Sequence, residues 1–337
     1  MKSFRVKEFG DIDFLEMVEE CTPQPGKKEV LIKIKACSLN HRDISMLLGT
    51  GTLSPLKELI PCSDGAGEIV EIGKDVTRFV KGDRVAGIFF PNWLGGELSE
   101  QTARGAWGLE SDGWLTQYKV ISEEALVRIP SHLSYEEAST LPCAAVTAWN
   151  SLLQPRALKA GETVLIQGTG GVSLFCLQFA KLLGLKVIAL TSTPEKEAML
   201  RKLNADHIIN YKEHPEWHNQ VKELTNGKGV DRIIEVGGPG TINNSLKSCS
   251  PGGEIIMLGF VAGSDYKIDY MTIYSSGAKL IPLSVGSRED FESMNKAISF
   301  GKIKPVISEV FRFEETKAAW IIIKQKKHIG KVVIKID

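Results

Sequence analysis

The sequence predicts an α/β protein in which a doubly wound parallel sheet is joined to a second, β-rich domain. Three observations lead to this prediction. The length of 337 residues suits two domains rather than one. Between Glu29 and about Val127, apolar residues come in short alternating runs separated by glycines, as in an all-β unit. After Pro130, strand-like and helix-like runs alternate to about residue 260, and such alternation builds a parallel sheet.

The parallel series is expected to contain strands with helices between them, and a capping box of Ser134 and Glu137 precedes it. The expected strands are Thr163–Gln167, Lys186–Thr191, His207–Asn210, Arg232–Val236 and Glu254–Leu258. The expected helices are Val172–Leu183, Pro194–Leu203, Glu216–Leu224 and Thr241–Cys249.

The rest of the chain is expected to return to the first domain. Its predicted elements are the helices Arg288–Phe300 and Glu314–Lys324 and the closing strand Lys331–Ile336. We therefore place the β-rich domain at residues 1–127, completed by 270–337, and the parallel-sheet domain at 128–269. The segment Pro91–Gly113 has several glycines and little periodicity, so we expect a long surface loop of the kind that lines a site.

Charge and cysteine content limit the possible partners. Forty-one basic residues balance 41 acidic ones, so no field of one sign attracts nucleic acid or an anionic membrane. No apolar stretch resembles a signal peptide or a membrane span. The six cysteines form no C-x-x-C pair, which favours reduced thiols. We expect a cytoplasmic protein that acts on a small molecule.

The stretch TVLIQGTGGVSLF, residues 163–175, predicts a dinucleotide site. Gly168, Gly170 and Gly171 would let the backbone approach a pyrophosphate, and a helix beginning near Val172 would direct its positive end at it. Ser173 stands where a third glycine is usual and is small enough for close packing. A plain tight turn is the alternative, but the order of strand, turn and helix favours a Rossmann domain.

The end of the second strand favours NADPH over NADH. NAD-binding domains usually carry an acidic residue there for the ribose 2′-hydroxyl, whereas this chain has Thr191, Ser192 and Thr193, followed by Lys196. A carboxylate about 4 Å from a 2′-phosphate would cost on the order of 4 kcal/mol at an effective dielectric of 20. Alternatively, Thr193 caps the helix that starts at Pro194, and Lys196 is solvated.

Several motifs together resemble one family across nearly the whole chain. They are ACSLNHRD at 36–43, PCSDGAGEIVEIG at 61–73, KGDRV at 81–85, LPCAAVTAW at 141–149, the glycine turn and NADHIINY at 204–211. This pattern resembles the zinc-lacking, quinone oxidoreductase-like branch of the medium-chain dehydrogenase/reductase superfamily. The resemblance implies a GroES-like catalytic domain, a Rossmann domain, and substrate bound in the cleft between them.

The same resemblance argues against zinc. The positions of the family's catalytic zinc ligands hold Asn40, Ser63 and Cys143, and a single thiolate binds zinc poorly. The family's structural zinc needs four close cysteines, and residues 90–115 contain none. His214 and His218 have the spacing of a metal pair, but Pro215 starts a helix after His214, so we expect these histidines to be solvated or capping.

Without a Lewis acid, reduction of conjugated carbonyls becomes the favoured chemistry. The resemblance implies that Asn40 donates to the substrate oxygen and that His41 contacts the cofactor pyrophosphate, while Asp43 and Asp64 orient donors. Each could instead be a turn, cap or exposed loop residue. We therefore predict an NADPH-dependent reductase of quinones or α,β-unsaturated carbonyl compounds.

Further positions are implied to lie near the cofactor. Thr147 resembles the residue beside the nicotinamide ring, and Tyr211 could close over the 2′-phosphate. Lys181 is favoured as solvated helix surface, and Cys143 as a core cysteine. Three glycines, Gly237, Gly238 and Gly259, end the fourth and fifth strands, where they allow close approach of the cofactor or simply make turns.

Two other functions and one assembly stay open. The first function is a zinc-less alcohol dehydrogenase that uses Asn40, Ser63 and water. The second is an NADPH-binding structural or RNA-binding protein, which the balanced charge disfavours. The apolar segment Ala278–Val285 is a candidate edge strand through which a homodimer would form.

Overall fold

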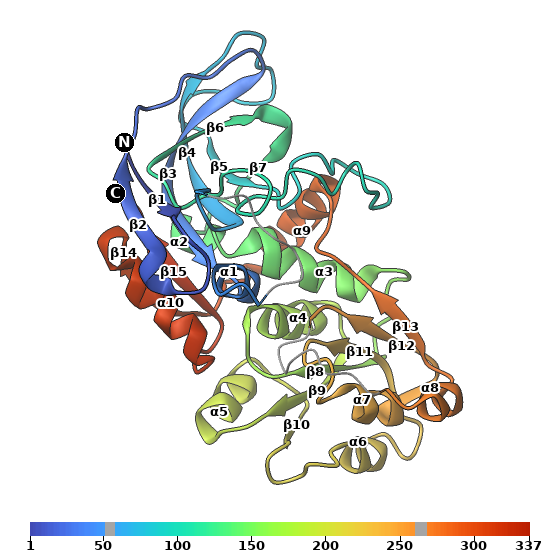
Figure 1. Ribbon diagram of the computed structural model, residues 1–337. Coiled ribbons are helices and arrows are strands. Elements are labelled where there is room, and N and C mark those ends of the chain that lie inside the picture. Colours follow the sequence, from blue (N-terminus) through green and yellow to red (C-terminus); the bar gives the residue numbers. More distant parts are fainter. Residues whose placement is uncertain (51–57, 260–267) are drawn as a thin grey trace. The chain divides into compact units, whose positions relative to one another are not determined.

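The computed structural model describes residues 1–50, 58–259 and 268–337 (Figure 1). The chain divides into two compact units. Unit 1 consists of Met1–Val146 and Val285–Asp337, and unit 2 of Thr147–Ser284.

Unit 1 is built on sheet structure that is antiparallel apart from the parallel pair β14 and β15. Its described residues form a hairpin of β1 (Lys2–Val6) and β2 (Leu15–Glu19) and a seven-stranded sheet in the order β14-β15-β3-β4-β5-β7, with β6 also pairing with β3. The strands of this sheet are β3 (Glu29–Leu39), β4 (Asp64–Ile72), β5 (Arg84–Gly87), β6 (Tyr118–Ser122), β7 (Leu126–Arg128), β14 (Ile307–Arg312) and β15 (Lys331–Lys335).

The core of unit 1 explains two of its glycines. Trp114 is fully buried beside β4 and β5. A Cβ atom at Gly65 would lie 2.4 Å from the Trp114 ring, and one at Gly87 would lie 2.0 Å from it. These strands therefore carry glycine where the indole lies against the sheet.

Short helices complete unit 1. They are α1 (His41–Leu47), α2 (Tyr135–Ala138), α9 (Arg288–Gly301) and α10 (Thr316–Gln325), with 3₁₀ turns at Ile12–Phe14, Glu123–Ala125 and Phe313–Glu315 and one π-helical turn at Leu141–Ala145. Ser134 and Glu137 form the expected capping box at α2. The helix α3 (Val146–Leu153) begins at the last residue before unit 2.

Unit 2 has the Rossmann topology. Where the chain is described, its sheet has six parallel strands in the order β10-β9-β8-β11-β12-β13. The strands are β8 (Thr163–Gln167), β9 (Lys186–Thr191), β10 (His207–Asn210), β11 (Val230–Glu235), β12 (Cys249–Met257) and β13 (Lys279–Pro282). The helices are α4 (Gly171–Leu182), α5 (Pro194–Lys202), α6 (His218–Leu224), α7 (Ile242–Ser248) and α8 (Tyr270–Ser276).

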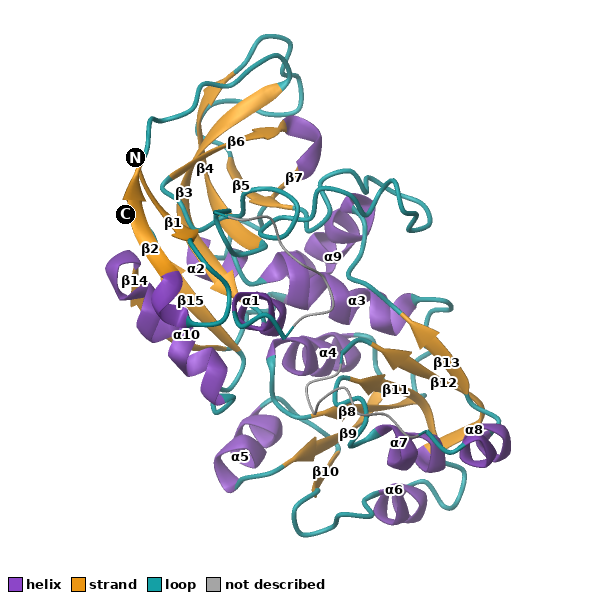
Figure 2. Cartoon of the chain, viewed as in Figure 1, coloured by secondary structure: helices purple, strands orange, loops and turns teal. Residues whose placement is uncertain are grey.

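Helices lie on both faces of this sheet, with α4 on one side and α6 and α7 on the other (Figure 2). Leu165, Ile188, Ile233 and Ile255 are buried in the strands, because a parallel sheet is covered on both faces. The predicted fold class, a Rossmann sheet with a β-rich domain, is confirmed.

The compact units differ from the predicted borders at 127/128 and 269/270. Residues 128–146 belong to unit 1 because α2 contacts β3, β4 and β15. The segment before residue 285 belongs to unit 2 because β13 pairs with β12. The predicted surface loop Pro91–Gly113 forms no named strand or helix, but Trp93, Trp107 and Leu109 are buried, so it is not a surface segment throughout.

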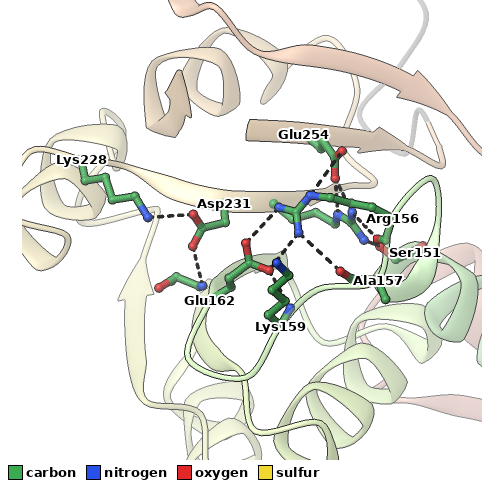
Figure 3. A network of polar contacts seen from close by, with 10 residues as sticks. Ser151, Arg156, Ala157, Lys159, Glu162, Lys228, Asp231 and Glu254 are labelled. Carbon is green, nitrogen blue, oxygen red and sulfur yellow. Dashed lines mark hydrogen bonds and ion pairs between the residues drawn. The ribbon is translucent and has the colours of Figure 1, made fainter. Parts of the chain in front are cut away.

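A polar network holds the amino-terminal edge of the parallel sheet (Figure 3). The buried guanidinium of Arg232 on β11 pairs with Glu254, its register partner on β12. It also donates to the carbonyl oxygens of Ser151 and Arg156, each at 2.9 Å. These bonds tie the end of α3 and the loop after it to the sheet, at the edge opposite the glycine turn, so we assign them a structural role.

The described helices include none that is both long enough and apolar enough to cross a bilayer.

Candidate functional site

Five polar residues of unit 1 meet where β3 ends, and we call them the Asn40 cluster: Asn40, Ser63, Asp64, Cys143 and Lys331. Sheet register brings them together, since Ser38 on β3 lies opposite Asp64 on β4, and Leu39 lies opposite Val332 on β15. Cys143 comes from the π-helical turn, a rare element that is frequent at functional sites. The sequence predicted three of the five as site residues, favoured Cys143 as a core cysteine, and did not predict Lys331.

The hydrogen bonds of the Asn40 cluster form a chain in which each residue donates to the next, from Lys331 to Asp64. Lys331 Nζ donates to Leu39 O at 2.7 Å and to Asn40 Oδ1. Asn40 Nδ2 donates to Ser63 Oγ at 3.3 Å. Ser63 Oγ donates to Asp64 Oδ1 at 2.7 Å, and the other oxygen of Asp64 accepts from Cys143 N at 3.0 Å.

This direction follows from the chemistry at each end. A lysine ammonium can only donate and an ionised carboxylate can only accept. The amide of Asn40 must therefore face Lys331 with its oxygen and Ser63 with its nitrogen. The predicted orienting role of Asp64 agrees with its two bonds.

Asp43 lies in α1, behind Asn40. It is 3% exposed, and its Oδ2 accepts from the backbone N–H of Asn40 at 2.7 Å, so it serves as a helix cap. Burial raises the pKa of Asp43 to about 6, with Arg42 opposing this rise and Asp64 adding to it. Its Oδ1 has no hydrogen-bond partner in the described structure, and Asp43 is one of the residues that line a cavity of about 10 Å³, which has room for about one water molecule.

The donors of the Asn40 cluster do not fit a catalytic zinc ion. An amide, a hydroxyl and one thiol stand at the three ligand positions, and burial raises the pKa of the Cys143 thiol far above its usual range, which disfavours the thiolate that zinc binds. Across residues 1–50, 58–259 and 268–337, no group of three or more His, Cys, Asp or Glu side chains could hold a metal ion. His214 contacts Gln220 at 3.1 Å, and His218 contacts Asn244 at 2.7 Å, so each histidine that the sequence analysis expected to be solvated or capping has a side-chain partner.

The glycine turn in unit 2 fits a dinucleotide. Gly168 has a φ of +73°, and Cβ atoms built at Gly168 and Gly170 meet nothing within 4 Å in the described chain. No described side chain caps α4, so its first N–H groups are open to a ligand. Ser173 Oγ donates to Gln167 O at 2.7 Å and ties the helix to the strand end.

The glycines after β11 are held by a buried acid that the sequence reading missed. Glu235 Oε1 accepts from the N–H groups of Gly237 and Gly238, each at 2.9 Å, and from Thr241 Oγ1 at 2.5 Å. A Cβ atom at Gly237 would lie 2.3 Å from Thr241 Oγ1, so the turn itself requires this glycine. The sequence signal that could have revealed Glu235 was a carboxylate at the end of the apolar run in RIIEVGG, residues 232–238.

Gln167 supports the same turn from β8. Its Nε2 donates to Glu235 Oε2 at 2.7 Å, and its Oε1 accepts from the N–H groups of Val236 and Gly237. A Cβ atom at Gly259 would lie 3.3 Å from Val236 O. The carboxyl ends of β8, β11 and β12 therefore meet at the edge where parallel sheets bind ligands.

The end of β9 shows both features that the sequence left open. Thr193 Oγ1 accepts from the N–H of Lys196 at 3.4 Å and caps α5, which is the alternative role considered for Thr193 from the sequence. Thr191 Oγ1 is buried without a partner among the described residues. Tyr211 is 40% exposed, and its backbone N–H donates to Thr191 O at 3.0 Å, so the backbone of Tyr211 lies beside the end of β9. The structure leaves the cofactor roles of these residues as predictions.

The remaining predicted positions are placed as follows. His41 is half-buried at the start of α1, with Ser45 Oγ 3.3 Å from its Nδ1, and burial lowers its pKa, helped by Lys326. Thr147 is buried in α3. Lys181 forms an ion pair with Asp206 at 2.7 Å, so it is paired rather than freely solvated.

Comparisons with known proteins agree with this arrangement. The sequence matches the family model of the zinc-binding dehydrogenases over residues 171–299, and that of the alcohol dehydrogenase GroES-like domain over residues 26–131. A zinc-type alcohol dehydrogenase-like protein of Schizosaccharomyces pombe is 41% identical, covering 98% of this chain and 97% of that one.

Two more distant relatives are named for other reactions. An acryloyl-coenzyme A reductase of Metallosphaera sedula is 29% identical over 99% of both chains. A quinone oxidoreductase of Sus scrofa is 28% identical, covering 99% of this chain and 97% of that one.

Solved structures give the same result. An NAD-dependent alcohol dehydrogenase superposes with a TM-score of 0.90 at 28% identity over 100% of both chains. A mycobacterial protein complexed with NADPH has a TM-score of 0.84 at 25% identity, covering 99% of this chain and 100% of that one. The chain belongs to the medium-chain dehydrogenase/reductase superfamily. It is an oxidoreductase that uses a nicotinamide dinucleotide, NAD or NADP.

Proposed function

We propose that this protein reduces quinones or α,β-unsaturated carbonyl compounds with NADPH and without zinc. The Asn40 cluster carries the proposal, because it directs an amide N–H where zinc-dependent relatives place a metal ligand. Relatives named as a quinone oxidoreductase and an acryloyl-coenzyme A reductase act on conjugated acceptors and support the substrate class.

The proposed chemistry needs a donor at the substrate oxygen. When bound, NADPH supplies the hydride, and electron density moves through the conjugated system to that oxygen. An amide nitrogen carries two hydrogens, and Ser63 takes one of them. The second N–H of Asn40 stabilises the developing negative charge, and a proton from water completes the product. Ser63 and Asp64 hold the amide in place.

The preference for NADPH is a separate part of the proposal. Residues 191–194, at the end of β9 and directly after it, include no acidic side chain, and Ser192, Thr193 and Lys196 offer hydroxyl and ammonium donors to a phosphate. The mycobacterial neighbour complexed with NADPH supports this preference, whereas the NAD-dependent neighbour shows that the fold also accepts NAD.

Titration of metal-stripped protein with NADPH and NADH, followed by turnover of 1,4-benzoquinone, tests the function. We expect NADPH to bind at least tenfold tighter and turnover to proceed with a chelator present. Asn40→Ala is expected to lower kcat about 100-fold while the Kd of NADPH stays within threefold, as for loss of one oxyanion donor. Tighter NADH binding, or activity that depends on added zinc, would overturn the proposal.

A zinc-less alcohol dehydrogenase is the second candidate, supported by the name of the S. pombe relative. It predicts oxidation of benzyl alcohol with NADP⁺ in the presence of a chelator, at a rate above that of quinone reduction. An NADPH-binding structural or RNA-binding role predicts salt-sensitive retention on RNA and no turnover of either substrate.

We also propose a cytoplasmic homodimer. The six cysteines are free thiols, which suits a reducing compartment. β13 is an edge strand that pairs with β12, and the preceding helix α8 exposes Tyr270, Met271 and Tyr274, which are 60–74% accessible. An open edge beside exposed apolar rings favours pairing with a second copy. A monomeric mass by light scattering at micromolar concentration would refute the dimer.

A further inference from the structure

We infer that Lys331 is a positioning residue that makes Asn40 a hydrogen-bond donor to substrate. The inference rests on the proposed function, because it assigns Lys331 a part in the same site. The first observation is that the Lys331 side chain is buried. Lys331 is the first residue of β15 and is 3% exposed, although a buried ammonium is costly unless it is well paired.

The partners of Lys331 are unusual for a buried cation. Both hydrogen bonds go to neutral oxygens, the backbone carbonyl of Leu39 and the amide oxygen of Asn40, rather than to a carboxylate. Asp43 and Cys143 feel its charge through space. The chain therefore uses a buried charge to hold one side-chain amide.

Lys331 and Asp64, on opposite sides of the Asn40 amide, decide which end of the amide is available. If Lys331 were neutral and apolar, the Asn40 amide could rotate by 180° about its last torsion. Asn40 Oδ1 would then face Ser63 Oγ, whose hydrogen already goes to Asp64 at 2.7 Å, so two acceptors would oppose each other. Lys331 and Asp64 together exclude that arrangement and keep the N–H groups of Asn40 toward Ser63 and the substrate.

The ammonium also strengthens the donor. A cation at the amide oxygen polarises the amide, and hydrogen bonds in series reinforce one another at low dielectric. The N–H groups of Asn40 become better donors to an oxygen that gains negative charge during hydride transfer. Lys331 thus supplies fixed positive charge behind the donor without touching the reacting atoms.

A merely structural role would be to fasten β15 to β3 through Leu39 O. A double-mutant cycle separates the two roles. Lys331→Met is expected to lower kcat for 1,4-benzoquinone about 100-fold, as does loss of an oxyanion donor, with the Kd of NADPH within twofold of wild type. Lys331→Met combined with Asn40→Ala is expected to be no slower than Asn40→Ala alone, because Lys331 acts through Asn40.

The matched control is Lys335→Met, at an exposed position of the same strand, which is expected to keep kcat within twofold. If Lys331→Met does not fold, Lys331→Gln takes its place, since glutamine can still donate to Leu39 O. Activity of the Lys331 variant within threefold of wild type, or losses that multiply in the double variant, would overturn the inference.

A second readout does not depend on turnover. The side-chain amide signal of Asn40 in ¹H–¹⁵N spectra, assigned by its loss in Asn40→Ala, is expected to shift in the Lys331 variant and not in Lys335→Met. An unchanged signal refutes the positioning of Asn40 by Lys331. If the wild type reduces neither quinone nor enone while this signal shifts, the proposed function fails and the positioning stands.

Discussion

Substitution of Gly170 is expected to weaken cofactor binding with little effect on folding, and it therefore tests the dinucleotide site. Its φ of −74° and ψ of 175° are open to any residue, and a Cβ atom there meets nothing within 4 Å in the described structure. Gly170→Val therefore removes no packing. Because Gly170 is the N-cap of α4, the exchange is expected to reduce the free energy of unfolding by about 1 kcal/mol at most.

The loss in binding is expected to be much larger. A pyrophosphate at the start of α4 would accept charge-assisted hydrogen bonds from backbone N–H groups, each worth about 1.5–3 kcal/mol. If the isopropyl group of valine prevents one or two of these bonds, the Kd of NADPH rises about 10- to 10,000-fold, since each 1.4 kcal/mol is a factor of ten. Gly170→Ala should fall between wild type and valine.

Quenching of protein fluorescence by NADPH measures the Kd, and thermal unfolding without ligand measures stability. An unchanged Kd in Gly170→Val would show that the pyrophosphate does not bind at this turn. A melting temperature far below that of wild type would show that the space around Gly170 is not open.

Three further outcomes follow from other residues. Ser192→Asp is expected to weaken NADPH binding at least tenfold and to leave NADH binding unchanged or improved, measured by the same titration; an unaltered ratio would place the 2′-phosphate elsewhere. Glu254→Gln leaves the guanidinium of Arg232 buried without its carboxylate, so the free energy of unfolding should fall by about 3–5 kcal/mol. Adding Arg232→Met should restore much of this loss in urea titrations, and a further loss would contradict the pairing argument. Burial lowers the pKa of Lys119 from its usual 10.5 to about 7, so between these pH values the unfolded chain binds more protons and wild-type stability rises with pH. At pH 6.5, Lys119→Met should be more stable than wild type by up to about 5 kcal/mol, since each pKa unit is 1.36 kcal/mol. The Trp107 ring, whose centroid lies 4.1 Å from Lys119 Nζ, offsets part of the cost of burying the ammonium. The advantage should close by about pH 10, and a gain independent of pH would refute the account.

Local sequence alone predicted the parallel series with good accuracy. β8, β9 and β10 begin and end at the predicted residues, because short apolar runs bounded by glycine, proline or asparagine determine a buried strand locally. β12 begins five residues earlier than predicted, at Cys249, since residues 249–253 extend as a strand in the sheet although Pro251, Gly252 and Gly253 disfavour one.

Local sequence likewise predicted only part of the candidate site. Motifs within a few residues of each other indicated Asn40, Ser63, Asp64 and the glycine turn. The register of β15 against β3 brought Lys331 to Asn40 from 291 positions along the chain, and no pattern near Lys331 marked it. The role of Glu235 likewise became clear from its hydrogen-bond partners on β8 and α7 rather than from its neighbours in the sequence.

The sequence by itself determined the Rossmann series and the glycine turn, because each depends on residue types at short spacing. Only the tertiary structure decided which way the Asn40 amide points and which buried charges hold the two turns. Hydrogen-bond direction depends on the partners that sheet pairing supplies, and those partners lie far apart in the chain.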